Sequence, residues 1–495
     1  MKLHHSLLTT LILSCCLFAC SNNDNDPQEE EEKRITTNEI YFANRFAKDA
    51  LSSVYLWNKE IKTGLDKLNA NTNQDPIGTV KEIRYKENGK EVDKWTVLTA
   101  DAESMNSSMQ GVSTTYGYEV MLGQFSNTKT YFFLVSLVYA NSPAEKAGIK
   151  RGDIIMQLDG KDITDDNYLD IYYTSNITLG MGVYSKQGIS RGENISLKAI
   201  NMYCNPILAN KIFEFNGKKV AYLAYSSFDV ESATKLVDIC RNYKTAGVSE
   251  LILDLRYNGG GYVFTENVMA SMFAPFDAVK SNAVYQTEIW NDEYMQYYKS
   301  KGEDLNTYFS TNHSITINGK KTTLNTSDAN IGLKKIYALI SSGTASASES
   351  LLIGLMPYMD IITLGNNSHG KYCTGIVATP DILYEKAPDV IKKWGIYVMI
   401  NRYADKNGKN PCMPDGLIPT QTVKDDPMDG YQLGDERETM LREALIKAGK
   451  KDIPTASTRT LLMPNYHTKY IQPNNPLFGK RILNEGEMKK LPKLY

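Results

Sequence analysis

A stretch near residue 340 joins a short apolar run (335–340), a tight turn (342–344) and a helical pattern (345–356) in direct succession. A strand that turns straight into a helix lifts the residue at the helix start out of the sheet, beside N–H groups without intrahelical partners. Such N–H groups can stabilise an oxyanion. Ser346 lies at this point, although the stretch alone also fits a serine-rich start used for capping. The pattern predicts an α/β layer and makes Ser346 a candidate nucleophile.

A lysine downstream supplies a candidate base. The run 361–365 predicts a second buried strand, and Gly370-Lys371 follow it. Serine is a poor nucleophile without a base, and a lysine serves as one when apolar surroundings lower its pKa. Ser346 and Lys371 are 25 positions apart.

The segment Thr-Ala-Ser-Ala-Ser-Glu (344–349), followed by Gly-Lys (370–371), resembles the C-terminal processing (tail-specific) peptidases. In that family the middle serine is the nucleophile and the lysine is its base, a variant of the serine-nucleophile arrangement. The resemblance implies a Ser346–Lys371 dyad within an α/β, ClpP/crotonase-like peptidase core. It also implies a reaction that needs no metal or organic cofactor.

Three glycines follow another predicted strand, 250–256, in the segment Tyr-Asn-Gly-Gly-Gly (257–261). Glycine allows backbone N–H groups to approach a ligand closely. In the family, a segment Asp-Leu-Arg-x-Asn-x-Gly-Gly supplies half of the oxyanion hole, and the amide after the nucleophile supplies the rest. The resemblance therefore points to Gly259 or Gly260 together with Ala347.

The residue that would orient the lysine departs from the family pattern. Many members have a glutamine four residues after the lysine, and Gly375 occupies that position here. Glu349, Ser348 and Asp360 are the candidate substitutes. Glu349 lies about one helical turn after Ser346 and so shares its face of the helix.

Other chemistries are excluded by residue type. Residues 365–371 match the first seven positions of a phosphate-binding loop, but Tyr372 stands where Ser or Thr is needed, and no helical pattern follows. After residue 20 the histidines are His313, His369 and His467, and we expect His369 to be a polar loop residue rather than a base. No clustered ligand set indicates a metal.

Residues 113–203 resemble a PDZ domain, most clearly over 141–155, where a Ser-Pro turn opens a short helix and Gly-Asp turns the chain into a strand. Such domains bind an extended peptide as an added strand, with backbone N–H groups holding its terminal carboxylate. By position in the family, that loop corresponds to Tyr116, Gly117 and Tyr118. The expected partner is a protein or peptide with a free, apolar C-terminal residue.

The first twenty residues predict a targeting segment. The apolar run 7–18 is too short to span a bilayer comfortably, and the segment ends Leu-Phe-Ala-Cys (17–20), which resembles a bacterial lipobox. That resemblance implies lipidation at Cys20. The acidic stretch 21–36 predicts a solvated tether and resembles the surface-export signal of Bacteroidota lipoproteins. We expect a membrane-anchored protein outside the cytoplasm, with the outer membrane favoured.

The amino-acid composition is typical of a globular protein. Apolar residues make up 42% of the 495 residues, the net charge is −2, and no basic patch indicates a nucleic-acid partner. Beyond Cys20 the cysteines are Cys204, Cys240, Cys373 and Cys412, too few for a disulfide framework and without metal spacing.

The expected architecture is a multidomain α/β chain of six regions. In order they are a lipoprotein signal peptide (1–20), the tether (21–36), a small N-terminal helical domain (37–112), a PDZ-like β-rich domain (113–203), the peptidase core (204–450) and a tail without a readable role (451–495). The main functional hypothesis is an extracytoplasmic serine endopeptidase that cleaves near protein C-termini. The alternative is a weakly active or inactive surface peptide-binding protein on the same scaffold.

Overall fold

The computed structural model describes residues 33–109, 112–126, 128–185, 188–317, 320–413, 415–454, 466–470 and 480–483. The predicted signal peptide, the lipidation site at Cys20 and most of the tether lie outside these ranges. Among the described residues, no helix has the length and apolar character needed to cross a membrane.

The N-terminal region is mainly helical, as expected, but it also contributes a strand to the core. Its elements are α1 (Asn38–Ser53), η1 (Lys62–Lys67), α2 (Pro76–Ile83), β1 (Lys86–Glu87), β2 (Lys90–Glu91), β3 (Val97–Thr99) and α3 (Ala102–Met109). The Thr37 hydroxyl caps α1 by accepting from Ile40 N–H at 3.2 Å. β3 pairs with β23 (Gly395–Asp405) of the core, and Leu56 N–H donates to Met399 O at 2.8 Å. These helices are therefore docked onto the core through backbone hydrogen bonds.

The next region is a β-rich domain with one main sheet in the order β10-β9-β7-β6-β5-β25. Its elements are β4 (Val112–Thr115), β5 (Tyr118–Phe125), β6 (Tyr131–Val138), α4 (Pro143–Lys146), β7 (Ile154–Leu158), β8 (Lys161–Asp162), α5 (Asp170–Tyr173), β9 (Asn176–Ser185), β10 (Gly188–Lys198) and β11 (Ile200–Tyr203). β4 and β11, the first and the last strand of the domain in the sequence, pair with each other in a separate two-stranded sheet. The last strand of the sheet, β25 (Tyr466–Tyr470), comes from the C-terminal tail.

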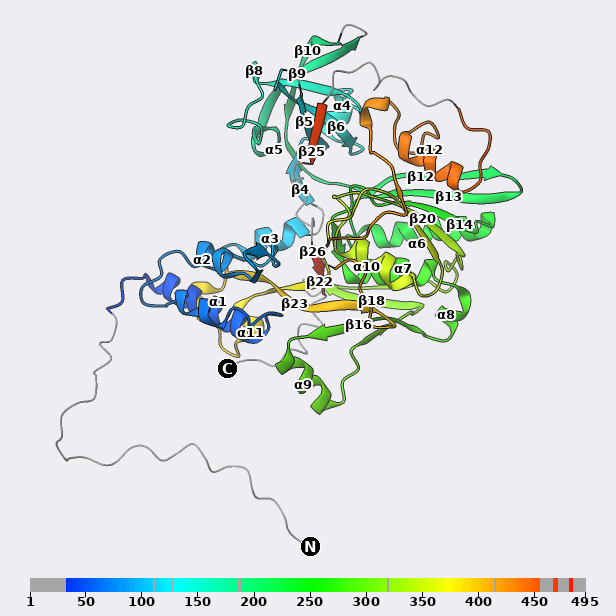
Figure 1. The fold of residues 1–495 in the computed structure, drawn as a ribbon. Helices are drawn as coiled ribbons and strands as arrows, with labels where there is room; N and C mark the ends of the chain where they lie inside the picture. Colours follow the sequence, from blue (N-terminus) through cyan, green and yellow to red (C-terminus); the bar gives the residue numbers. More distant parts are fainter. Residues whose placement is uncertain are drawn as a thin grey trace, which may run out of the picture.

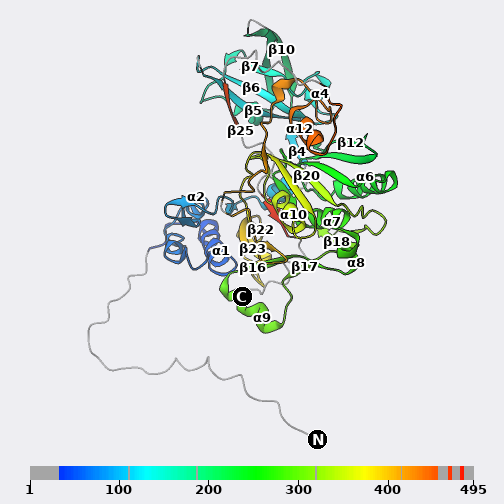
Figure 2. The ribbon, with the colours of Figure 1, turned by 45° about the vertical axis from the view of Figure 1, so that its right-hand side comes forward.

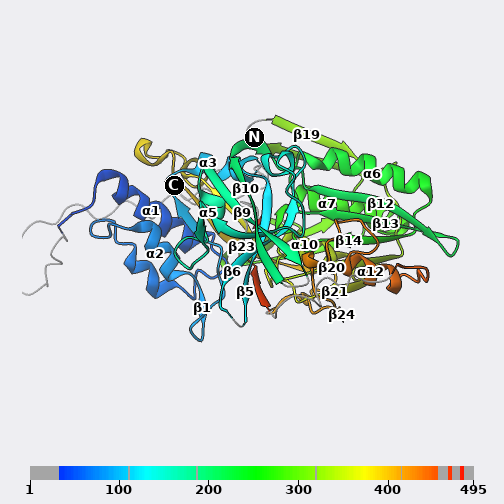
Figure 3. The ribbon, with the colours of Figure 1, turned by 90° about the horizontal axis from the view of Figure 1, so that it is seen from above.

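The core contains a six-stranded sheet in the order β12-β13-β14-β20-β21-β24, parallel except for β12. Its strands are β12 (Ile207–Phe215), β13 (Lys218–Tyr225), β14 (Glu250–Asp254), β20 (Lys335–Ile340), β21 (Asp360–Gly365) and β24 (Gln421–Thr422). Side chains alternate between two hydrophobic cores, as period-two geometry requires: Leu251 and Leu253 face one, and Ile252 faces the other. α6 (Ser232–Ala246) and α10 (Ala347–Leu355) cover the first face, and α12 (Thr439–Lys447) covers the second. Figure 3 shows α6 and α12 on opposite sides of the strands.

A second sheet of the core has the order β15-β26-β22-β23-β16-β17. It comprises β15 (Gly260–Tyr262), β16 (Val284–Trp290), β17 (Asn306–Tyr308), β22 (Cys373–Ala378), β23, and β26 (Lys480–Ile482) from the tail. The remaining core elements are α7 (Val263–Phe273), α8 (Phe276–Lys280), α9 (Asp292–Lys301), the β18–β19 hairpin (Asn312–Ile317, Lys320–Asn325), α11 (Pro380–Leu383), η2 (Asp389–Ile391) and η3 (Pro427–Asp429).

The N-terminal region and the tail both add a strand to the second sheet, whereas the β-rich domain contacts the core through Arg151, which binds Asp425 and Glu438. Figure 1 shows the β-rich domain above the core, the N-terminal helices beside β23, and the tail strands β25 and β26 in red, one among the strands of the β-rich domain and one beside β22. Figure 2 shows the same helices against β22 and β23 from another angle. Residues 451–495, whose pattern predicted no role, thus contribute a strand to each of two sheets.

Candidate active site

The turn before α10 has the strand–turn–helix geometry expected from the sequence. β20 ends at Ile340, and the turn closes through hydrogen bonds from Thr344 N–H to Ser341 O (2.8 Å) and from Ser341 N–H to the Thr344 hydroxyl (2.9 Å). α10 begins at Ala347, which makes Ser346 the residue that precedes the helix.

Ser346 is strained and buried. Its backbone has φ 63° and ψ −113°, in a region that residues with a side chain rarely adopt. Its side chain is fully buried, and its Oγ is among the buried polar atoms of the described residues that have no hydrogen-bond partner. A buried, unpaired hydroxyl costs free energy, so this arrangement is expected where the atom has a chemical task.

The glycine loop packs directly against the serine turn. Asn258 O accepts from Ala345 N–H at 3.0 Å and from the Ser348 hydroxyl at 2.9 Å. The Asn258 side chain also forms hydrogen bonds within this loop and to the neighbouring strand. Its amide donates to Tyr225 O, and its Oδ1 accepts from Gly260 N–H, both at 2.9 Å. The Gly260 amide is therefore occupied, and of the two expected glycines Gly259 is the one suited to an oxyanion.

Glu349 connects the serine turn to the lysine loop. Its Oε2 accepts from the amides of both Ser346 (2.7 Å) and Lys371 (3.0 Å), and its Oε1 accepts from Gly370 N–H at 2.7 Å and from the Ser368 hydroxyl. Burial raises the pKa of this carboxyl, and the hydrogen bonds from Ser368, Gly370 and Ser346 lower it only in part. One carboxylate oxygen thus brings the Ser346 and Lys371 backbones within two hydrogen bonds of each other.

A second bridge comes from β23. The Tyr403 hydroxyl donates to Lys371 O at 2.6 Å and lies 3.3 Å from Ser346 O. Glu349 was one of the expected supporting residues, whereas Tyr403 was not.

The Lys371 side chain is fully buried among aromatic rings. Its Nζ donates to the Tyr397 hydroxyl at 3.0 Å and lies 5.2 Å from the ring centroids of both Tyr397 and Trp95. Trp95 belongs to the N-terminal region and is held by Asp93, whose carboxylate accepts from the Trp95 and Thr96 amides. The N-terminal region therefore forms part of the lysine pocket.

Tyr397 lies where a side chain at position 375 would project. A side chain at Gly375 would have its Cβ 2.6 Å from the Tyr397 ring and 2.5 Å from Met399 Cε. A glutamine at position 375 would therefore collide with Tyr397, and the tyrosine hydroxyl now contacts the lysine. The sequence offered no signal for the contact between Tyr397 and Lys371, because this contact depends on the pairing of β22 with β23.

Asp360 does not reach the site, so its expected supporting role is wrong. It lies at the first position of β21, with a 74% exposed side chain that pairs with Lys335 at 3.7 Å. The strand carries the chain about 17 Å from Asp360 to Gly365 before the lysine loop begins. Ser348 is also committed elsewhere, because its hydroxyl donates to Asn258 O.

His369 lies beside Trp95, with ring centroids 6.1 Å apart. Burial, followed by the positive charges of Lys94 and Lys371, lowers the pKa of this histidine to about 4. A histidine with such a low pKa is a weak base.

The loop expected to hold a peptide carboxylate has a tight backbone. Gly117 has φ 85°, and a Cβ there would lie 2.1 Å from Ser142 Cβ. The rings of Tyr116 and Tyr118 stack at 5.7 Å, and their hydroxyls donate to Thr174 O and Ile171 O. Both tyrosine side chains are buried in the core of the domain, so the loop can offer a ligand chiefly its backbone.

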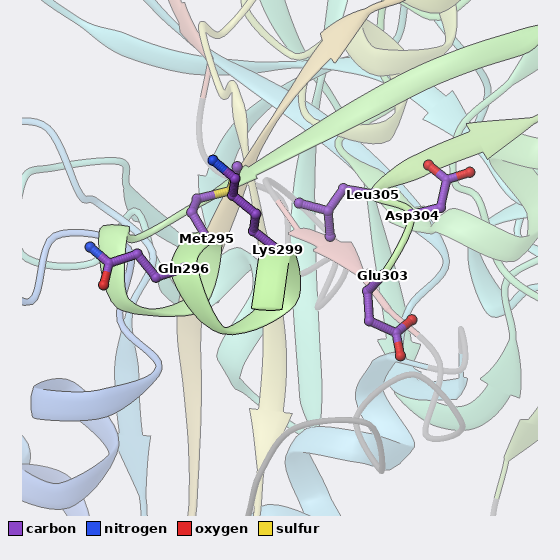
Figure 4. A pocket seen from close by; sticks show the side chains of 6 residues that line it. All are labelled: Met295, Gln296, Lys299, Glu303, Asp304 and Leu305. Carbon is purple, nitrogen blue, oxygen red and sulfur yellow. The ribbon is translucent and has the colours of Figure 1, made fainter. Parts of the chain in front are cut away.

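Two surface hollows contain none of the residues expected in the site. One, of about 400 Å³, lies along α9 and the segment after it and is shown in Figure 4 with Lys299, Glu303 and Asp304 among its lining residues. The other, of about 620 Å³, is bordered by Tyr203, Glu231 and Tyr262. Tyr262 belongs to β15, so this second hollow lies next to the glycine strand. In the part of the chain that the structure describes, none of the four cysteines named above forms a disulfide.

Comparison with known proteins agrees with this geometry. The model of peptidase family S41 matches residues 219–423, and the PDZ domain model matches residues 134–172. The chain therefore carries an S41 peptidase domain and a PDZ domain, which confirms the resemblance expected from the sequence. Their matched ranges lie within the predicted core and PDZ-like regions.

Individual relatives are distant. The chain is 26% identical over 285 residues to "Probable CtpA-like serine protease" of Staphylococcus aureus (strain N315), a match that covers 56% of this chain and 48% of the relative. It is 24% identical over 330 residues to "Carboxyl-terminal-processing protease" of Picosynechococcus sp. (63% and 65% covered). The match thus spans about half the length of the first of these relatives.

A solved structure shares the fold. This is a candidate S41 protease from Bacteroides fragilis NCTC 9343, with a TM-score of 0.61, 22% identity, and coverage of 82% of this chain and 98% of the other.

Proposed function

We propose that this protein is a serine endopeptidase of the C-terminal processing type, with Ser346 as nucleophile and Lys371 as general base. The observation that carries the proposal is the state of Ser346: a strained, buried serine with an unpaired hydroxyl, joined by Glu349 to the lysine loop. Structural serines are normally hydrogen-bonded when buried. The S41 match and the names of the relatives support the same reaction class.

The reaction follows from these positions. Ser346 Oγ attacks the carbonyl carbon of the peptide bond while the neutral Lys371 amine takes its proton. The amides of Gly259 and Ala347 stabilise the oxyanion. Lys371 then gives the proton to the leaving amine, and water attacks the acyl-enzyme by the reverse route. No step requires a metal or an organic cofactor.

Tyr397 and Glu349 have supporting parts in this proposal. Tyr397 fixes one N–H of the Lys371 ammonium or amine, which directs the rest of the group. Glu349 fixes the backbones from which both reacting side chains project. Neither residue contacts the substrate in this scheme.

Substitution of the dyad tests the proposal. With an unfolded polypeptide as substrate, Ser346→Ala and Lys371→Ala should each lower the cleavage rate by about 10⁴-fold or more. Ser350→Ala is the matched control, because Ser350 lies one turn further along α10 and its hydroxyl donates to Glu266 at 2.6 Å. That variant should lose some stability and keep its activity. Cleavage by either dyad variant at the wild-type rate would refute the assignment.

A second candidate function is peptide binding without catalysis. The observation in its favour is that Ser346, Lys371 and Gly259–Gly261 are all buried, which leaves a substrate no direct access. An unfolded polypeptide that stays intact in the presence of the wild-type chain, yet binds equally well to Ser346→Ala, would support this alternative.

For substrate choice, we infer a preference for a free, apolar C-terminal residue held by the Tyr116–Tyr118 loop. A peptide that took the place of β25 beside β5 would have the loop amides at the start of that strand. Two peptides that differ only in a free or amidated C-terminus provide the test. Equal cleavage of both would remove carboxylate recognition and leave the dyad unaffected.

For location, we infer lipidation at Cys20 and a position outside the cytoplasm, with the outer membrane favoured. Several acyl chains hold a protein at a bilayer far better than one chain does. Cys20→Ser should release the protein from membranes or block its processing. Unchanged membrane fractionation would argue against the anchor.

A further inference from the structure

The edge of the PDZ domain that would accept a peptide is already covered by the protein's own tail. Without β25, the sheet would end at β5, the strand that follows the Tyr116–Tyr118 loop. β25 pairs with β5 in antiparallel register, from Tyr466 opposite Phe125 to Tyr470 opposite Met121. An extended ligand that adds a strand to this domain would use the same N–H and C=O groups.

The Tyr466 side chain packs this tail strand against the domain. The Tyr466 ring packs edge-on against Phe132 at 5.6 Å, and Lys424 Nζ lies 4.8 Å from its centroid. Its neighbours Phe125, Phe132 and Met428 form a separate small apolar cluster. His467, the next residue, is exposed. Among the described side chains of β25, Tyr466 thus adds an aromatic contact to the backbone pairing.

The tail also covers the site proposed for catalysis. β26 lies between β15 and β22 and runs parallel to both. Gly260, the first residue of β15, follows Gly259 directly and is in register with Lys480, while β22 begins two residues after Lys371. Ile482, opposite Tyr262 and Gly375, is only 4% exposed.

The pairing of β25 with β5 and that of β26 with β15 both occupy backbone groups to which a substrate would have to bind. A peptide whose scissile carbonyl is to reach Ser346 and the Gly259 amide must lie extended beside the glycine strand. β26 occupies that edge, and Ser346 and Lys371 have no exposed surface in this arrangement.

We propose that tail residues 466–470 and 480–483 act as an intramolecular competitor that occupies the peptide edge of the PDZ domain and the substrate cleft of the peptidase. The second contact rests on the proposed peptidase function, whereas the first does not. Because the tail is part of the chain, its effective concentration is in the millimolar range, so an external peptide binds weakly until the tail is displaced. Displacement should raise the apparent affinity for a peptide about tenfold or more.

The experiment uses the full chain with a reversible cross-link. His467 and Gln124 face each other across β25 and β5, at a separation that suits a disulfide. In His467→Cys/Gln124→Cys, oxidation holds the tail on β5, and reduction leaves it free to dissociate as it does in the parent chain. The opposite change is Thr468→Pro, which removes a backbone donor in the middle of β25 and weakens its pairing. His467→Ala is the matched control, because that side chain is exposed.

Binding is measured first, with catalysis removed. In a Ser346→Ala background, a fluorescent peptide with the sequence of residues 464–484 should bind Thr468→Pro at least tenfold more tightly than the parent. It should bind the oxidised cross-linked chain at least tenfold more weakly than the reduced one. A scrambled peptide should bind none of them. Equal affinities for locked, released and parent chains would overturn the proposal, because a permanent structural strand predicts that result.

Cleavage is then measured with Ser346 intact, which separates this inference from the proposed function. Thr468→Pro and the reduced double cysteine should show at least tenfold higher kcat/KM than the oxidised form. Cleavage that is unaffected by the state of the tail would refute the competitor and leave the peptidase standing. Tail-dependent binding without cleavage by any variant would refute the peptidase and leave the β5 contact standing.

Discussion

Two buried polar clusters lie close to the loop that follows β14, one around Arg256 and the other at Ser346, and they are organised in opposite ways. Around Arg256, Nε, Nη1 and Nη2 all donate to the carboxylates of Asp254, Asp425 and Glu438, at 2.6–3.0 Å. At Ser346, by contrast, the hydroxyl has no partner and the backbone is strained. A buried polar group whose donors are all used holds the structure together, whereas one left unpaired is available for chemistry.

The Arg256 cluster also connects three parts of the chain. Arg151 of the PDZ domain donates to Asp425 at 2.8 Å and to the hydroxyl of Tyr257, which itself donates to Asp425. Burial would raise the pKa of Asp425, but the Arg151 and Arg256 charges outweigh it and lower the pKa to about 2. Asp425 thus stays ionised at neutral pH, and the cluster joins the PDZ domain to the glycine loop.

The largest effect should come from breaking this cluster. Arg256→Met removes the main cation from two buried carboxylates, Asp254 and Glu438, and from the nearly buried Asp425, so we expect the free energy of unfolding to fall by about 3–5 kcal/mol. Arg241→Met is the control, because Arg241 is 43% exposed in its pairs with Asp238 and Asp328 and should cost below about 1 kcal/mol. Urea denaturation measures both. Similar losses in the two variants would mean that burial adds nothing to the Arg256 pairs.

The next effect tests whether the lysine pocket acts through Tyr397. Tyr397→Phe keeps the ring over Lys371 but removes the hydroxyl, so kcat should fall about 10- to 100-fold with KM nearly unchanged. The acid limb of the pH–rate profile should move as well, since the hydroxyl contacts the titrating group. Tyr337→Phe is the control, because that hydroxyl contacts Glu250 instead. An unchanged rate and profile would show that the hydroxyl has no part in catalysis.

These residues also separate what the sequence could predict from what it could not. The Ser346 turn, the glycine loop and the Lys371 loop were predictable, because each depends on a contiguous run of turn and strand signals. Tyr397 and Trp95 were not, because they reach Lys371 only through the pairing of β23 with β22 and with β3. The tail strands were missed for the same reason: short segments such as 480–482 acquire their structure from the strands beside them.

A smaller effect concerns the loss of stability at acid pH that is caused by His369, which lies beside the proposed active site. The pKa of His369 is lowered to about 4, whereas an unfolded histidine titrates near 6.5. Between these values the unfolded chain binds the extra proton, so stability is full above pH 6.5 and falls as the pH drops toward 4. His369→Asn should therefore reduce the loss of unfolding free energy between pH 7 and pH 5 by about 1–2 kcal/mol.

His313 provides the matched comparison for that titration. Burial also lowers its pKa to about 4, but it lies on β18, away from Lys371. His313→Asn should reduce the acid sensitivity to a similar extent without changing the rate of cleavage. An acid slope that neither variant alters would show that other groups cause the sensitivity.

The smallest effect should come from the strain at Ser346 itself. At φ 63° and ψ −113° a side chain is disfavoured, and glycine adopts such a backbone at little cost. Ser346→Gly should therefore abolish cleavage while raising the free energy of unfolding by about 1 kcal/mol. Ser350→Gly should do the opposite to stability, because position 350 is inside α10 and its hydroxyl is bonded to Glu266. If Ser346→Gly destabilised the protein as Ser350→Gly does, the strain would not be stored at the nucleophile. The contrast between Ser346 and the fully hydrogen-bonded Arg256 guanidinium would then rest on hydrogen bonding alone.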